Sequence, residues 1–264
     1  MTAPCLTIKN MTLAYGNFII QQDLDFTINR GDIFIIMGGS GCGKSTLLMH
    51  LIGLQRPAKG DVFYGEESLW HSDDQERKRI LKRTGVLFQS GALLSSMTLA
   101  ENIALPITEH TKLGSERIRR IVSYKLALVG LSGFEDYYPS EISGGMQKRA
   151  GLARAMALDP EILFFDEPSA GLDPISAKLL DDLILGLRDN LGATVVMVTH
   201  ELASIFAIGT NSVFLDAEAK TMIASGSPKK LLAESIDPKV IRFLTRGETE
   251  NPENDTHYQD RNTL

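Results

Sequence analysis

A glycine-rich loop that follows an apolar run is the feature that most constrains the fold of this chain. The apolar residues Ile33–Met37 lead directly into Gly38-Gly39-Ser40-Gly41-Cys42-Gly43-Lys44-Ser45, and Thr46 opens a helical pattern. This string matches G-x-x-x-x-G-K-[ST], in the strand-to-helix context where that motif wraps phosphates. Its glycines free backbone N–H groups for phosphate oxygens, Lys44 reaches the β and γ phosphates, and Ser45 offers its hydroxyl to Mg²⁺. The sequence therefore predicts a nucleoside triphosphate site.

A second helix start with the same chemistry lies further along the chain, in Ile142-Ser143-Gly144-Gly145-Met146-Gln147. Ser143 is a good helix N-cap, and the two glycines let the backbone come close to a ligand. The unpaired N–H groups of a helix start attract anions. Two phosphate-facing helix starts in one NTPase suggest that two copies of the chain share each nucleotide.

Two adjacent carboxylates, Asp166 and Glu167, follow the apolar run Ile162–Phe165. Ligands of parallel sheets bind at the carboxyl ends of strands, where Asp166 is expected to hold Mg²⁺ directly or through water. Glu167 is expected to point the other way on the strand and to act as general base for the attacking water. The alternative is an acidic helix-start device, because Pro168 comes next.

Polar or aromatic residues also end other predicted strands. Gln89 follows Val86–Phe88, and His200 comes soon after Thr194–Val198. Alone, each is an ordinary strand terminus, but beside a γ-phosphate they are better explained as a water or Mg²⁺ contact and as a γ-phosphate sensor. Tyr15 ends an early strand, where it is either an adenine-stacking residue or a core or edge aromatic.

The alternation of short apolar runs with helical patterns predicts a mainly parallel sheet covered by helices, because these runs lack the polar alternation of half-exposed strands. From about Leu99 to Leu158 the strands stop, and a helical lobe inserted between two sheet strands is expected. Its helices are Glu116–Val129 and Gly145–Leu158, with Pro106, Gly130 and Pro139 as breaks. After His200 we expect a helix, strands Asn211–Asp216 and Met222–Ala224, helices from Pro228 and Pro238, and a polar flexible tail from Gly247 to Leu264.

Composition narrows the class of protein. The net charge of −6 and pI near 5.4 argue against a nucleic-acid partner, and the basic clusters Arg77–Arg83 and Arg117–Arg120 are interpreted as solvated helix faces. Cys5 and Cys42 do not form a disulfide framework, and Cys42 serves the loop as a small side chain rather than a redox switch. Neither a signal peptide nor an apolar stretch of about 20 residues is present, so any link to a membrane is expected to run through a partner.

Taken in order, these motifs resemble the nucleotide-binding subunit of ABC transporters, over nearly all of residues 4–245. The resemblance implies an α/β fold of the P-loop NTPase class, with a RecA-like mainly parallel sheet core, an antiparallel β subdomain and a helical subdomain at about 92–158. It implies an ATPase domain at 1–245 and a polar tail at 246–264. Ser169-Ala170-Gly171-Leu172-Asp173 resembles the D-loop, and Ser143–Met146 the signature.

The resemblance also implies the roles of individual residues and partners. ATP and Mg²⁺ are the expected cofactors, two copies are expected to meet head to tail, and an integral membrane permease is expected to hold the homodimer at the cytoplasmic face of the inner membrane. Catalysis is assigned to Glu167, His200, Gln89 and Lys44, and Mg²⁺ to Ser45, Gln89 and Asp166. The nucleotide contacts are Tyr15, Gly38, Gly39, Ser40, Gly41, Cys42, Gly43, Lys44, Ser45, Thr46, Ser143, Gly144, Gly145, Met146 and Asp173.

A finer resemblance, to the ATPases of Mla/Mce-type systems that move phospholipids between bacterial membranes, is carried by Leu87–Leu94, Glu101–Pro106, Glu109–Thr111 and the Met146 of the signature. It implies lipid cargo, a Mce-domain periplasmic subunit and a small cytosolic STAS-like subunit as further partners, and a chain end after Ile236 that reaches the neighbouring copy through Arg242, Phe243 and Leu244. A plain disordered tail is the alternative to that last role. For the whole chain, the rivals are an ABC ATPase with another substrate or a non-transport role, such as cluster assembly or cell division, and a module that holds nucleotide without hydrolysing it.

Overall fold

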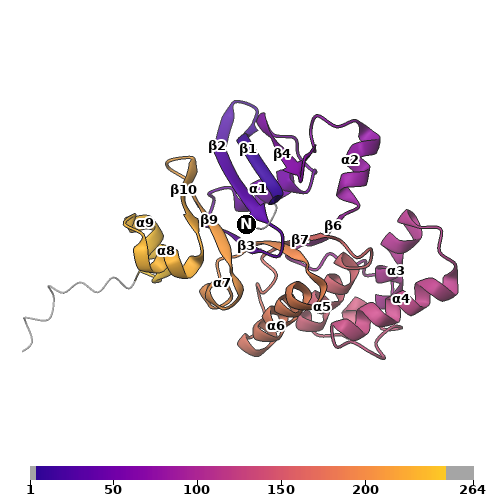
Figure 1. The fold of residues 1–264 in the computed structure, drawn as a ribbon. Helices are drawn as coiled ribbons and strands as arrows, with labels where there is room; N and C mark the ends of the chain where they lie inside the picture. Colours follow the sequence, from indigo (N-terminus) through magenta and orange to yellow (C-terminus); the bar gives the residue numbers. More distant parts are fainter. Residues whose placement is uncertain (1–3, 248–264) are drawn as a thin grey trace, which may run out of the picture.

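Two β-sheets and a set of surrounding helices make up the computed structural model, which describes residues 4–247 (Figure 1). The smaller sheet has four strands in the order β2-β1-β4-β5, and the larger has six in the order β10-β9-β3-β8-β7-β6. The strands are β1 Pro4–Tyr15, β2 Phe18–Asn29, β3 Ile33–Gly38, β4 Lys59–Tyr64, β5 Glu67–Ser68, β6 Thr84–Leu87, β7 Ile162–Asp166, β8 Thr194–Val198, β9 Asn211–Asp216 and β10 Thr221–Gly226. The helices are α1 Lys44–Leu51, α2 Asp74–Leu81, α3 Leu99–His110, α4 Ser115–Leu128, the 3₁₀ turn η1 Pro139–Glu141, α5 Gly144–Ala155, α6 Pro174–Leu191, α7 Leu202–Ile208, α8 Pro228–Glu234 and α9 Pro238–Leu244.

The larger sheet is parallel from β9 through β3, β8 and β7 to β6, and only β10 runs antiparallel. Every residue of β3 and of β8 is buried. This agrees with the absence of polar alternation in the sequence, since a strand covered on both faces needs apolar side chains on both. The smaller sheet is antiparallel, as the predicted antiparallel β subdomain requires.

Side chains of alternate β3 residues pack into two different hydrophobic cores, one on each face of the larger sheet. Ile33, Ile35 and Met37 pack with the helices α5, α6 and α7, whereas Phe34 and Ile36 pack with α1 and the smaller sheet. Figure 1 shows these layers, with β1, β2 and α1 above the sheet and α5, α6 and α7 below it. Full burial of one such side chain stabilises the fold by about 1.5–3 kcal/mol.

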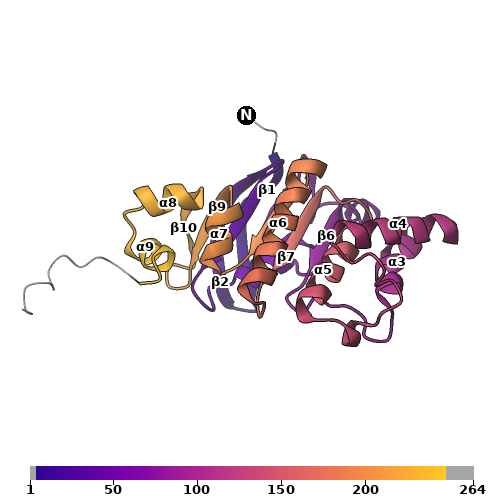
Figure 2. The same ribbon diagram turned by 90° about the horizontal axis from the view of Figure 1, so that it is seen from below.

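The predicted helical insertion lies between β6 and β7. These strands pair directly, with Thr84 opposite Ile162 and Leu87 opposite Phe165, so the intervening chain leaves and returns to the same edge of the sheet. That chain forms α3, α4, η1 and α5, and Figure 2 shows α3 and α4 at the end of the molecule opposite α8 and α9. Subdomain boundaries at about 92–158 remain a prediction.

One predicted break is wrong, because Pro106 lies inside α3. The helix has a strong start, where Thr98 and Glu101 form a capping box, and its apolar stripe of Leu99, Ile103 and Ile107 is buried. Pro106 removes one helical N–H donor, yet packing of this stripe keeps the chain helical up to His110. The segment is therefore a third helix of the insertion that the sequence interpretation did not delimit.

Two further features were not predicted, the β4–β5 hairpin and α6, whereas α2 carries most of the basic cluster Arg77–Arg83 that the sequence analysis interprets as a helix face. The signals for α6 were present, since Asp173 caps its first turn, Pro174 follows, and Gly192 adopts the left-handed conformation after its last turn. Pro228 and Pro238 begin α8 and α9 as expected.

Within residues 4–247, no helix combines the length and apolar character needed to cross a bilayer. The predicted tail falls almost wholly on residues 248–264, outside the described part of the chain.

A stability prediction follows from the contact between β6 and α5. A Cβ atom at Gly85 would lie 2.1 Å from the carbonyl oxygen of Ala155, so Gly85→Ala must push strand and helix apart. We expect the free energy of unfolding to fall by about 1–3 kcal/mol. Urea denaturation followed by circular dichroism measures this change.

Gly186→Ala is the matched control for that variant. Gly186 lies within α6, and a Cβ there would meet nothing closer than Asn190 Nδ2 at 3.7 Å. Alanine should raise the helix propensity and stabilise the protein by up to about 1 kcal/mol. Equal effects of the two substitutions would contradict the predicted contact at Gly85.

Candidate nucleotide-binding site

The loop between β3 and α1 has the geometry of an anion cradle. A Cβ atom at Gly38 would lie 2.4 Å from the carbonyl oxygen of Leu215 and 2.6 Å from Cys42 Sγ, so only glycine fits there. Helix α1 begins at Lys44 after Gly43, whose φ is 94° and which provides no side-chain cap. The first N–H groups of α1 are therefore free of a side-chain cap and available to an anion.

Lys44 spans this loop. Its Nζ donates hydrogen bonds to the main-chain oxygens of Gly38 and Gly39, both at 2.9 Å. Phosphate oxygens are stronger partners for an ammonium than neutral carbonyls are, so a triphosphate in the loop would attract this side chain. The loop therefore supplies backbone N–H groups and one cation for the same ligand.

Cys42 occupies the loop as a buried small residue. It is 1% exposed, both cysteines are free, and burial raises the pKa of the Cys42 thiol. A raised thiol pKa disfavours the reactive thiolate. The environment of Cys42 therefore favours the predicted packing role over the redox switch.

The oxygens of Ser45 and Asp166 converge across the loop. Ser45 Oγ donates to Asp166 Oδ1 at 3.1 Å, and burial raises the pKa of Asp166, partly offset by this hydrogen bond. Residues 4–247 contain no group of three or more His, Cys, Asp or Glu side chains arranged to hold a metal. A hydroxyl and one carboxylate nonetheless fit Mg²⁺, which prefers oxygen ligands and keeps waters and phosphate oxygens around it.

Glu167 and His200 form a pair beside the loop. His200 Nδ1 lies 2.9 Å from Glu167 Oε1, while Glu167 Oε2 is buried and has no hydrogen-bond partner among the described residues. The expectation that Glu167 alternates with Asp166 on the strand is wrong, because β7 ends at Asp166 and Glu167 has a φ of 48°. Its N–H still donates to Val198 O of β8, but the chain turns at once, with Ala170 N donating to Glu167 O at 3.1 Å, so the side chain leaves from a turn. The structure thus leaves one carboxylate oxygen free to accept a proton.

A pocket of about 870 Å³ gathers most of these residues, although Cys42 and Asp166 are not among those that line it. Tyr15 lines it with 57% of its surface exposed, and its hydroxyl donates to Gln55 Oε1 at 3.3 Å, so it is not a core aromatic. The sequence interpretation missed some lining residues. Phe18 pairs with Tyr15 across the β1–β2 hairpin, a signal that alternation could have supplied, whereas Phe243 comes from α9 and no local pattern places it there. The lining residues are Tyr15, Phe18, Ile20, Gly38, Gly39, Ser40, Gly41, Gly43, Lys44, Ser45, Thr46, Glu167, His200 and Phe243.

Several predicted site residues do not line this pocket. Ser143 caps α5, accepting a hydrogen bond from Met146 N at 3.3 Å, and a Cβ at Gly144 would meet no atom within 4 Å. Asp173 caps α6 through Ile175 N and Ser176 N, both at 3.0 Å. Gln89 has an exposed side chain beyond the end of β6. One copy of the chain thus assembles the loop half of the predicted site, and the α5 start stays open.

Two of the predicted anchors at the chain end pack on their own chain to different extents. Leu244 is 3% exposed, and the Phe243 ring meets the Phe214 ring edge to face with centroids 5.2 Å apart. Leu244 is therefore buried within its own chain and is not free to act as an anchor, whereas Phe243 is only partly buried and lines the pocket, so its role as an anchor for a neighbouring copy stays a prediction. Arg242 remains exposed.

Lys44→Ala tests the loop as a triphosphate site. Removing a charged hydrogen-bond donor should weaken ATP binding by about 10- to 100-fold. Calorimetric titration with ATP measures the loss. Lys112→Ala removes an exposed lysine between α3 and α4 and should bind like the wild type. Unchanged affinity in the Lys44 variant would contradict the site.

Known proteins with similar sequences point to one family. Residues 21–170 match the ABC transporter family. The intermembrane phospholipid transport system ATP-binding protein MlaF of Haemophilus influenzae is 40% identical over 252 residues, covering 96% of this chain and 94% of that protein. MlaF of Escherichia coli K12 is 38% identical, covering 92% and 89%. A probable ribonucleotide transport ATP-binding protein, mkl, of Mycobacterium tuberculosis is 41% identical, covering 90% and 66%.

Solved structures agree with the sequence comparison. The ATP-binding cassette MJ0796, in a dimeric post-hydrolysis state bound to ADP and Pi, is 29% identical with a TM-score of 0.74, covering 84% of this chain and 98% of that one. The protein cbiO1 of Clostridium perfringens, part of the ABC transporter complex cbiONQ, is 26% identical with a TM-score of 0.80, covering 92% and 95%. The match over more than half of the chain, the near full-length relatives and the loop pocket together show that this chain belongs to the ABC transporter family, as one of its ATP-hydrolysing ATP-binding subunits.

Proposed function

We propose that this protein hydrolyses ATP to drive phospholipid transport between bacterial membranes. The observation that carries the proposal is the match to MlaF of Haemophilus influenzae over nearly the full length of both proteins, at 40% identity. The mkl protein matches at a similar identity, but the chain covers only 66% of it, so ribonucleotide cargo is less well supported. The substrate is therefore a lipid in this proposal, and the nucleotide is the fuel.

In the proposed catalytic centre, the loop N–H groups and Lys44 hold the triphosphate. Mg²⁺ would be held by Ser45, Asp166 and Gln89, and when bound it supplies positive charge to the phosphate oxygens. Coulomb attraction between unit charges 4 Å apart in a partly shielded site is about 4 kcal/mol, so these contacts are strong enough to fix the triphosphate. Tyr15 is proposed to stack on the adenine at the rim of the pocket.

Glu167 is proposed as the general base, and His200 holds it. The 2.9 Å contact between His200 Nδ1 and Glu167 Oε1 occupies one carboxylate oxygen, which leaves Oε2 to accept the proton of the attacking water. The His200 side chain is 58% exposed, so it can also reach a γ-phosphate above the loop. The same histidine would thereby orient the base and sense the phosphate.

A second copy is proposed to complete each site with its Ser143–Met146 and Asp173. Two features support this arrangement: these residues lie outside the pocket of their own chain, and the start of α5 is open at Gly144. ABC cassettes form dimers, and one similar cassette is dimeric with ADP and Pi bound. A nucleotide held between two copies would bridge them, and its hydrolysis would remove the bridge.

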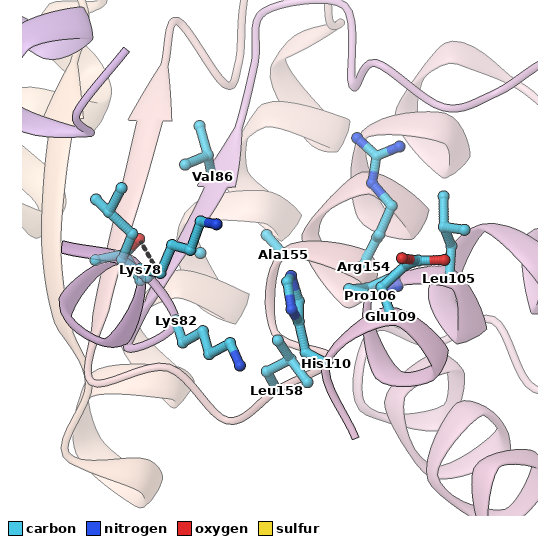
Figure 3. Close-up of a pocket in the computed structure, with 13 residues that line it drawn as sticks. Lys78, Lys82, Val86, Leu105, Pro106, Glu109, His110, Arg154, Ala155 and Leu158 are labelled. Atoms are coloured by element: carbon cyan, nitrogen blue, oxygen red, sulfur yellow. Dashed lines mark hydrogen bonds between the residues drawn. The ribbon is translucent and has the colours of Figure 1, made fainter. Parts of the chain in front are cut away.

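The membrane permease is proposed to dock in a groove of about 750 Å³ between α2 and α3. Figure 3 shows Lys78 and Lys82 on one side, Leu105 and Glu109 on the other, and Ala155 between them. The groove lies beside the segment that follows Gln89, because Arg154, one of its lining residues, donates hydrogen bonds to Gly91 O and Ala92 O. An apolar floor with one basic wall, formed by Lys78 and Lys82, fits a short amphipathic helix that carries acidic residues on the side facing these lysines.

The remaining partners are proposed from the likeness to the MlaF proteins. The docked permease would hold the ATPase at the cytoplasmic face of the inner membrane. A Mce-domain periplasmic subunit and a small cytosolic STAS-like subunit would complete the system. Their presence distinguishes this proposal from an ABC ATPase that serves cluster assembly or cell division.

Glu167→Gln tests the proposed base. The amide keeps the shape of the side chain but accepts a proton poorly, so turnover should fall by about 10²- to 10⁴-fold while ATP binding persists. A phosphate-release assay and calorimetry measure the two quantities. Glu234→Gln, on the exposed face of α8, is the control. Near-normal turnover in the Glu167 variant would remove Glu167 from this role.

Purification of the protein with its membrane permease tests the groove and the cargo together. We expect phospholipid, identified by mass spectrometry, to accompany the complex. Charge reversal at Lys78 and Lys82 should release the permease because it opposes acidic partner residues, while the isolated ATPase keeps its activity. The same reversal at Arg117 and Arg120, exposed on α4, changes the net charge equally and should leave the complex intact.

Two outcomes of that purification would contradict the proposal. Enrichment of a non-lipid solute with the complex would overturn the lipid cargo. Loss of the permease from both charge-reversal variants would show a general charge effect and remove the groove as the docking site.

A further inference from the structure

A buried lysine that the proposed chemistry does not use lies on the helix of the second phosphate-facing start. Lys148 is in α5, only 7% exposed, and its Nζ donates to the main-chain oxygen of Gln89. Burial lowers the pKa of Lys148, and the nearby carboxylates of Glu167 and Asp166 oppose that shift. This ammonium therefore stands between the α5 start, the Gln89 segment and the acidic end of β7.

Lys148 belongs to one face of α5 that grips the main chain after β6. Gly151, one turn later, lets the chain approach so closely that a Cβ there would lie 3.0 Å from Gly91 O. Arg154, another turn along, donates to Ala92 O at 2.7 Å and to Gly91 O at 3.2 Å. Residues three apart share a helix face, so the carbonyls of Gln89, Gly91 and Ala92 are all held by α5.

The energetics of burial argue against a purely structural purpose for Lys148. Taking an ammonium out of water is unfavourable unless partners replace its hydration, and a buried charge is often no more stable than an apolar residue of the same size. The hydrogen-bond partner of Lys148 among the described residues is a neutral carbonyl, and the carboxylates of Glu167 and Asp166 offset its desolvation only in part, without a direct ion pair. A methionine of similar length would fill the same space without the desolvation of an ammonium.

We infer that Lys148 is a positioning residue for ATP hydrolysis, which holds the main chain at Gln89 and ties the placement of the Gln89 side chain to the position of α5. The inference rests on the proposed roles of Gln89 and of the α5 start. A shift of α5, when its N-terminal end meets the nucleotide of another copy, would then move Gln89 relative to Asp166 and Glu167. Contact with the second copy and readiness for hydrolysis become coupled through one side chain.

The test compares Lys148→Met, which removes the charge, with Lys148→Arg, which keeps it. We expect Lys148→Met to lower kcat about 10- to 100-fold, because misplacing a group near the reacting atoms has effects of this size. The KM for ATP should stay unchanged, and Lys148→Arg should restore most of kcat. Lys125→Met is the matched control, since Lys125 of α4 is also a buried lysine, 2% exposed, but it pairs with Asp159 in the segment between α5 and β7.

Hydrogen–deuterium exchange of the nucleotide-free protein gives a readout independent of turnover. In Lys148→Met the amide hydrogens of residues 89–94 should exchange about tenfold faster, while those of α1 stay unchanged. Wild-type kcat in Lys148→Met, an equal loss in Lys125→Met, or unaltered exchange at 89–94 would each overturn the inference. A wild-type protein without ATPase activity would overturn the proposed function instead, and the exchange experiment would still decide whether Lys148 holds the segment.

Discussion

Parallel pairing of β3, β8 and β7 is the constraint on which the candidate site depends. The pairing places Ile36 beside Val198, and Val198 beside Asp166, so three chain segments far apart in sequence end at one edge. The phosphate loop starts at the end of β3, Glu167 directly follows β7, and His200 lies two residues after β8. The hydrogen bond from Ser45 to Asp166 joins residues 121 positions apart, and it forms only because both strands end together. Burial of the apolar strands on both faces of the sheet thus holds the strands in register, and this register brings the polar residues that follow them together.

That edge carries its chemistry in turns rather than in regular structure. Gly38 and Gly43 adopt backbone conformations that a side chain would hinder, and Glu167 adopts the left-handed region at a φ of 48°. A non-glycine residue in this region costs of order 1–3 kcal/mol, and the hydrogen bond of the Glu167 N–H to Val198 O helps to hold it. The turn directs Oε1 to His200 and leaves Oε2 without a protein partner. The strained backbone of Glu167 therefore gives its carboxylate an orientation toward His200 that a residue in extended conformation would not have.

The buried strands and the loop were predictable from sequence because their signals are local. An apolar run such as Thr194–Val198 and a loop such as Gly38–Ser45 each carry their own periodicity or spacing. The turn at Glu167 was not predictable, since it depends on a carbonyl of another strand. Pro106 inside α3 and Phe243 at the pocket depend on packing against distant segments. The sequence analysis assigned Lys148 no role, because its burial against Gln89 O depends on a segment 59 positions away.

The α5 helix connects two parts of the proposed site. Its start is proposed to meet the nucleotide of another copy, and its later residues contact the Gln89 segment of its own chain. Its first residues are open to a second copy, and its later side chains grip the main chain after Gln89, at the rim of the groove proposed for the permease. A ligand changes an equilibrium only by the difference in its affinity for the two states. A nucleotide bridging two copies binds the closed arrangement alone, so its binding energy would favour the α5 position that closure requires. Because α5 holds the same segment that borders the groove, that preference would be passed directly to a permease docked there.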